Sequence, residues 1–85
     1  MNENITVSKL VMLNTPKDVN EFVALNNTFR GVIDCIESHR NIDGKSIMGV
    51  YSMDLSKPIN VVYYGATGSE DIFKVLAKWE VAICG

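Results

Sequence analysis

The sequence has a single histidine and only two cysteines, and this scarcity excludes the common kinds of protein metal site. Cys35, Cys84 and His39 lack the paired spacing that tetrahedral zinc ligation requires, so we expect no metal and no cofactor. One pair of cysteines is also not a disulfide framework. In a reducing cytoplasm both side chains are therefore expected to be free thiols.

Basic residues are not in excess either, because 8 Lys and Arg stand against 10 Asp and Glu, for a net charge of −2. Proteins that contact nucleic-acid phosphates need a surplus of Lys and Arg, so no direct nucleic-acid partner is expected. No apolar run approaches the roughly 20 residues that span a bilayer. The segment Met1-Asn2-Glu3-Asn4 lacks the basic start of a secretory signal, so we expect a cytoplasmic protein without a membrane partner.

The composition that remains is that of one small globular domain. The chain has 85 residues, of which 47% are hydrophobic and 21% charged, and it contains no repeat and no linker-like segment. These values are typical of a folded domain and not of a disordered chain. We therefore expect a single domain over residues 1–85.

Four segments have the β-branched and apolar character of strands: 5–13, 32–37, 40–42 and 59–64. The alternation of the first segment breaks at Lys9, so its register stays open. In the last segment Tyr63 and Tyr64 must point to opposite faces of a sheet. One tyrosine is therefore expected on an exposed face, which leaves a monomer or a weak homodimer as the predicted state.

Three helices are predicted between and after these strands. Thr15 is a suitable N-cap for the first, with Pro16 at its first position, and this helix is expected to end near Thr28. Ser46 is the expected cap of a short second helix, which Gly49 weakens. Ser69 is the expected cap of the last. The apolar face of the first helix consists of Val19, Phe22 and Val23, and that of the last of Ile72, Val75, Leu76, Trp79 and Ile83.

The resulting order is βαββαβα. Because the two middle strands form a hairpin, the simplest arrangement is a four-stranded, mainly antiparallel sheet with three helices on one face. The predicted fold class is thus α+β, a two-layer open-faced sandwich.

The hexapeptide Lys45-Ser46-Ile47-Met48-Gly49-Val50 resembles the central motif of HPr, the histidine-containing phosphocarrier of the bacterial sugar phosphotransferase system. The length of the chain, the order of its elements and the place of the motif also match this family. The resemblance implies an HPr-like fold over the whole chain.

The residues at the family's phosphorylation site differ from its His-x-Arg-Pro pattern. Counted without gaps from Ser46, Thr15 occupies the phosphohistidine position, Lys17 the arginine position and Asp18 the proline position. A threonine hydroxyl is a poor nucleophile without a base, and its phosphate ester is too stable for a carrier. Asp18 adds negative charge where the family holds phosphate. We therefore expect a non-catalytic protein that has lost the phosphocarrier reaction, as in the catabolite-repression paralogue of HPr.

The resemblance leaves Ser46 and its helix as the predicted functional surface. In related proteins the matching serine is phosphorylated by an HPr kinase, and the product binds a transcriptional regulator of carbon catabolite repression. Partner binding is expected to involve Lys45, Ile47, Met48 and Tyr51, because exposed Met and Tyr suit adaptable interfaces.

Two alternatives to a regulatory or adaptor role stay open. The protein could be a working phosphocarrier that uses Thr15 or His39 in place of the family's histidine. It could also be a divergent protein-binding domain unrelated to sugar uptake, because a fold does not determine function.

Overall fold

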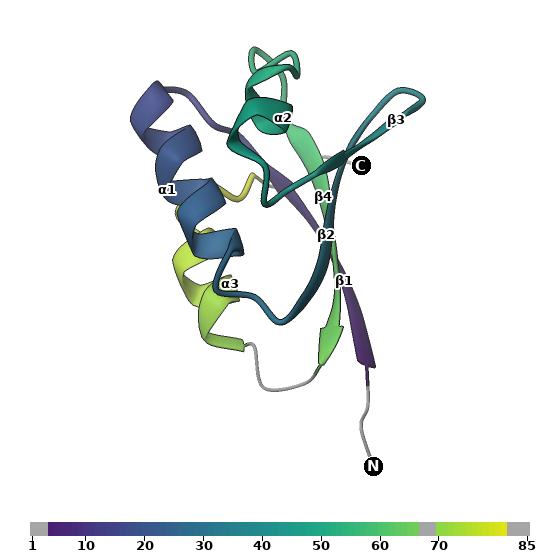
Figure 1. Cartoon of the computed structure of the whole chain (residues 1–85). Coiled ribbons are helices and arrows are strands. Elements are labelled where there is room, and N and C mark those ends of the chain that lie inside the picture. The colour runs from purple at the N-terminus through teal and green to yellow at the C-terminus, as the bar shows by residue number, and fades with distance from the viewer. Residues whose placement is uncertain (1–3, 67–69, 82–85) are drawn as a thin grey trace.

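The polypeptide folds as one sheet covered on one side by helices, and the computed structural model describes residues 4–66 and 70–81 (Figure 1). The order is the predicted βαββαβα. The elements are β1 (Asn4–Val11), α1 (Pro16–Asn26), β2 (Gly31–Glu37), β3 (Arg40–Asp43), α2 (Ile47–Tyr51), β4 (Ile59–Ala66) and α3 (Glu70–Leu76).

The strands lie in the order β1-β4-β2-β3, and every pair of neighbours is antiparallel. The central strand β4 pairs with β1 on one side and β2 on the other, so Tyr63 has Val7 and Ile33 as its cross-strand partners. All three helices lie on one face of this sheet in Figure 1. The predicted α+β open-faced sandwich is confirmed.

The core lies between the sheet and the helices. Tyr63 is fully buried there, and Phe29 and Phe73 meet its ring edge-on at centroid distances of 5.3 and 5.2 Å. Tyr64 is 42% exposed on the opposite face, which confirms that the two tyrosines point apart. Lys9, which breaks the pattern of β1, lies on the helix side, where its ammonium is 5.9 Å from the Phe73 ring centroid and pairs with Glu80 at 3.6 Å.

A buried polar network joins the two layers. The Asn26 side chain on α1 is fully buried, and its Nδ2 donates to the carbonyl of Gly44 at 2.8 Å. Its Oδ1 accepts a hydrogen bond of 2.9 Å from the Tyr63 hydroxyl. Asn26 therefore connects α1, the central strand and the turn before α2.

The main differences from the sequence prediction concern the end of β1 and the last helix. The last helix ends at Leu76, so Trp79, which was predicted on its apolar face, follows the helix. The strand predicted over 5–13 ends at Val11, after which Met12 N donates to the Trp79 carbonyl at 2.8 Å. Val75, predicted on the apolar face of the last helix, is 45% exposed. That face is rotated toward Phe73, which packs on Tyr63, and this rotation turns Val75 to solvent. Ser69, Ile83 and Cys84 lie outside the described residues.

Cys35 is a buried free thiol on the helix side of β2.

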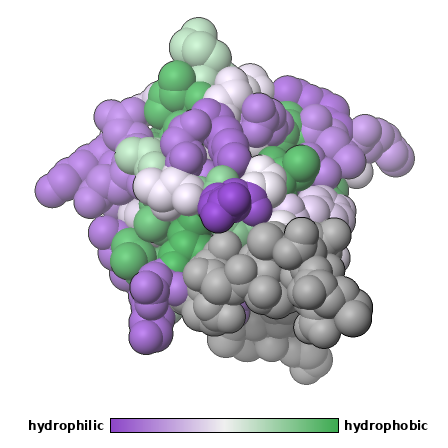
Figure 2. Space-filling view, turned by 60° about the horizontal axis from the view of Figure 1, so that its bottom comes forward, coloured by the Kyte–Doolittle hydropathy of each residue, from purple (hydrophilic) through white to green (hydrophobic). Residues whose placement is uncertain are grey.

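The surface of the domain carries both hydrophobic and hydrophilic residues. On the face that Figure 2 shows, hydrophobic residues form separate clusters among hydrophilic ones. In the described part of the chain, the helices are too short and too polar for any of them to cross a membrane.

Candidate functional site

The start of α1 is built around the side chain of Thr15. Thr15 has an extended backbone (φ −135°, ψ 158°), and its Oγ1 accepts a hydrogen bond of 3.1 Å from Asp18 N. Pro16 follows at the first helical position, where its missing N–H costs nothing. The Thr15 hydroxyl is thus an exposed helix cap.

Asp18 gives this end of α1 a negative charge. Its Oδ2 accepts from Asn14 N at 3.1 Å. A hydrogen bond from the Trp79 side chain, with further ones from Asn14 and Thr15, lowers the pKa of the Asp18 carboxyl. A carboxylate held ionised beside Thr15 repels a phosphate group, so the local electrostatics do not favour a phosphoryl transfer at this threonine.

Ser46 is the N-cap of α2. Its Oγ accepts from Gly49 N at 3.1 Å, and its carbonyl accepts from Val50 N at 3.0 Å. The serine itself is half-buried. Its hydroxyl therefore already has a structural role in starting a helix of only five residues.

Three apolar or aromatic side chains of α2 lie on the surface, and we call them the α2 patch: Ile47, Met48 and Tyr51, which are 36, 76 and 41% exposed. Val50, on the other side of the same helix, is fully buried against the core. One side chain of α2 thus packs in the core, and three lie at the surface.

Tyr51 brings the α2 patch to the start of α1. Its hydroxyl donates to the Pro16 carbonyl at 3.3 Å. The structure therefore places Thr15, through its neighbour Pro16, on the same surface as the α2 patch. Sequence reasoning did not find this contact, because 35 residues separate its two partners.

Lys45 makes a structural contact. Its Nζ donates to the Phe29 carbonyl at 2.8 Å, and its own carbonyl accepts from Asn27 Nδ2 at 3.2 Å. Both contacts fasten the turn before α2 to the end of α1. The Lys45 ammonium is therefore already hydrogen-bonded to a backbone carbonyl of the same chain.

His39 lies in the exposed turn between β2 and β3, next to Ser38, which has a positive φ of 53°. No contact among the described residues joins His39 to Thr15 or to the α2 patch. Lys17 is exposed near the start of α1. In the same described ranges, no three His, Cys, Asp or Glu side chains are grouped to hold a metal ion.

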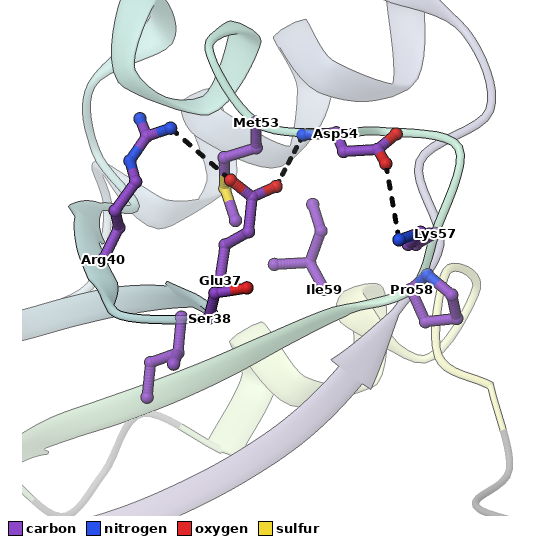
Figure 3. Close-up of a pocket in the computed structure, with 9 residues that line it drawn as sticks. Glu37, Ser38, Arg40, Met53, Asp54, Lys57, Pro58 and Ile59 are labelled. Carbon is purple, nitrogen blue, oxygen red and sulfur yellow. Dashed lines mark hydrogen bonds and ion pairs between the residues drawn. The ribbon is translucent and has the colours of Figure 1, made fainter.

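A cleft of about 500 Å³ opens beside the β2–β3 hairpin, with Met53 and Ile59 in its wall (Figure 3). Glu37 Oε2 accepts from Asp54 N at 2.6 Å, and Glu37 Oε1 pairs with Arg40 at 3.5 Å. Lys57 pairs with Asp54 at 3.8 Å. The charged groups of the cleft thus neutralise one another.

A second hollow, of about 350 Å³, lies at the start of α1 and is lined by Asp18 and Trp79 among others. Sequence reasoning assigned Trp79 to the core alone. The side chain is 6% exposed and meets the Phe22 ring edge-on at 6.1 Å, but it also acts on the Asp18 carboxyl. The interaction of the Trp79 indole with the Asp18 carboxyl could not be predicted from the sequence, because the two residues are far apart in the chain.

Comparisons with known proteins give one informative result. No family model and no curated protein matches the chain. Among solved structures, the chain is similar to the crystal structure of a phosphocarrier protein HPr from Bacillus anthracis str. Ames, with 22% identity and a TM-score of 0.61. The match covers 94% of this chain and 100% of that one. An HPr-like fold is therefore established for the whole described domain.

Proposed function

We propose that this protein is a cytoplasmic, non-catalytic relative of the phosphotransferase-system phosphocarriers, which acts as a regulatory or adaptor protein through the α2 face. In this proposal the protein does not carry phosphate on a histidine. Ser46 is its regulatory phosphorylation site, and an HPr kinase and a transcriptional regulator are the partners in view. The likeness to a phosphocarrier protein HPr supports this class of function.

The α2 patch is the observation that carries the proposal. A five-residue helix exposes three large side chains, and Met48 alone is 76% exposed. Solvating such side chains is unfavourable, and clustered exposed Met and Tyr are typical of protein-binding surfaces. The patch also adjoins Ser46, so a phosphate there changes the charge at its border.

The start of α1 argues against the phosphocarrier alternative. Thr15 is a cap whose neighbouring carboxylate is kept ionised, and His39 is in a separate hairpin turn. The carboxylate beside Thr15 repels the phosphoryl group that this hydroxyl would have to accept, and among the described residues His39 has no contact with the start of α1. Both side chains are more simply explained by local structure.

The first experiment is intact-mass analysis after incubation with ATP and an HPr kinase. We expect one added phosphoryl group on the parent protein and none on Ser46→Ala. The adduct is expected to survive mild acid, because a phosphoserine ester is stable where a phosphohistidine is not. An acid-labile adduct, or one retained in Ser46→Ala, would instead support the phosphocarrier alternative.

Partner binding is tested by pull-down with the full chain and three variants. Met48→Asp and Ser46→Asp change the proposed face, and Val75→Asp is a matched control at an exposed apolar side chain of α3. We expect the first two to change the set or amount of bound protein and the control to leave it unchanged. Unchanged binding in both α2 variants would contradict the proposal.

A further inference from the structure

The sheet face opposite the helices has no part in the proposed function. All three helices lie on the other side (Figure 1), and no described helix covers this one. Side chains alternate along each strand, so the face is formed by the residues between the core positions. Among them are Tyr64 and Val62 on β4, Val32 on β2 and Leu10 on β1.

Apolar side chains form a continuous strip on this face. Val32 and Tyr64 are direct cross-strand partners, and they are 58 and 42% exposed. Val62, two residues from Tyr64, is only 7% exposed yet does not belong to the core cluster between sheet and helices. Tyr64 and Val32 thus form a solvent-exposed cross-strand pair, and Val62 is their apolar neighbour.

Two carboxylates lie beside this strip. Asp34 is the cross-strand partner of Val62 on one side and of Asp43 on the other. Like charges placed directly opposite each other destabilise a sheet. Neither Asp34 nor Asp43 takes part in an ion pair among the residues that the structure describes.

No cation of the described strands balances these carboxylates on the same face. Lys9 and Arg40 both point to the helix side, where Lys9 reaches Phe73 and Arg40 donates to Ser52 Oγ at 3.0 Å. Lys45 follows Asp43 closely, but its ammonium is bound to the Phe29 carbonyl. Asp43 Oδ1 accepts a hydrogen bond of 2.9 Å from the backbone N–H of Lys45, but no side-chain cation of the described strands lies beside either carboxylate. The face is therefore apolar and acidic.

We propose that this sheet face binds a segment of a partner protein that presents a Lys or Arg flanked by apolar side chains. The cation would lie between Asp34 and Asp43, and its apolar neighbours would cover Val32 and Tyr64. A second copy that docks through the same face is a poor occupant, because it brings two more carboxylates, while the cations of its strands lie on the helix side. This surface is separate from the α2 patch, so the inference does not depend on the proposed function.

The test is selection of random peptides displayed on phage against the immobilised full chain. We expect enriched peptides to carry Lys or Arg next to Val, Ile, Leu or aromatic residues. Synthetic copies of them should bind Asp34→Lys at least about tenfold more weakly than the parent, and Asp34→Asn with an intermediate loss. Asp71→Lys, the same charge reversal at a fully exposed position of α3, is the matched control and should bind them as the parent does.

Tyr64→Ser gives an independent variant of the same face that keeps both carboxylates, and circular dichroism checks the fold of each protein. The inference is overturned if no peptide is enriched, or if the enriched peptides bind Asp34→Lys and Tyr64→Ser like the parent. It is also overturned if sedimentation velocity finds a dimer that Tyr64→Ser abolishes, because a second copy would then be the occupant.

Discussion

Asn26 shows how one residue can fix the relation between distant segments. It is the fully buried polar residue of the described core, and both ends of its amide are paired, with Gly44 O and with the Tyr63 hydroxyl. A buried polar group stabilises the fold only while its partners are present. The identity of residue 26 is therefore more constrained than its place on a helix suggests.

Replacing Asn26 by Ala should be among the costly single changes in this protein. Two buried groups lose their partner, so we expect the free energy of unfolding to fall by about 2–4 kcal/mol. Urea denaturation followed by circular dichroism measures this loss. Asn20→Ala, at an exposed position of the same helix, should change stability by less than about 0.5 kcal/mol. Equal losses in the two variants would refute the role assigned to Asn26.

Cys35 should make stability depend on pH in the alkaline range. Burial, with added repulsion from Asp34 and Asp43, raises the pKa of its thiol to about 12. In the unfolded state the thiol ionises near its ordinary pKa of 9.0. As the pH rises above this value, ionisation therefore lowers the free energy of the unfolded state while the folded thiol is still protonated. The free energy of unfolding should therefore fall between about pH 9 and pH 12, by at most about 1.4 kcal/mol per pH unit from this group.

The control for this prediction is Cys35→Ala, whose stability should be flatter over the same pH range although lower in absolute terms. The buried Tyr63 hydroxyl, whose pKa burial also raises, contributes to the remaining slope in both proteins. Identical slopes in the parent and in Cys35→Ala would show that the thiol does not titrate differently on unfolding.

At the scale of elements, α2 depends on its cap more than a long helix would. It has five residues, and Ser46 satisfies Gly49 N at its start. We expect Ser46→Ala to lower the free energy of unfolding by about 1 kcal/mol. Ser46→Asp should keep most of that stability, because aspartate is an equally good cap. Thermal unfolding compares the two variants.

The same pair of variants separates the structural and regulatory roles of Ser46. If Ser46→Asp were as unstable as Ser46→Ala, a change in partner binding by Ser46→Asp could reflect damage to α2. If it is as stable as the parent, such a change reports on charge at the helix start.

Helix starts were the elements that the sequence predicted best. Thr15 and Ser46 were both expected as caps, and both accept the expected backbone hydrogen bond. Helix faces were harder, because Val75 satisfied the periodicity and is nevertheless exposed. Residue spacing predicts that one side of a helix is apolar. Which side of α3 faces the sheet is decided by the packing of Phe73 against Tyr63.

For the whole molecule, the position of each strand in the sheet should determine how it opens. The central β4 pairs with β1 and β2 along its length, whereas β3 pairs with β2 alone over four residues. We expect amide hydrogens of Val61, Val62 and Tyr63 to exchange slowest, near the rate of global unfolding. Those of β3 should exchange much faster. Hydrogen exchange followed by NMR checks this order, and slower exchange in β3 would contradict it.

The overall architecture was predictable because the order βαββαβα, with a hairpin of its two middle strands, favours a mainly antiparallel sheet covered by helices on one face. The resemblance carried by residues 45–50 pointed to the same fold. The joining of α1 and α2 at Pro16 and Tyr51 was not predictable, nor was the double use of Trp79. Both depend on side chains that meet only after the sheet has brought their helices together.

The placement of the single tryptophan gives the protein an optical sensor of its own. The Trp79 indole is almost fully enclosed, touches Phe22 and is coupled to the Asp18 carboxyl at the start of α1. Its emission should therefore respond to any ion or partner that perturbs that carboxyl. Events around Thr15 can be followed in the unlabelled protein, without introducing a dye or altering a residue.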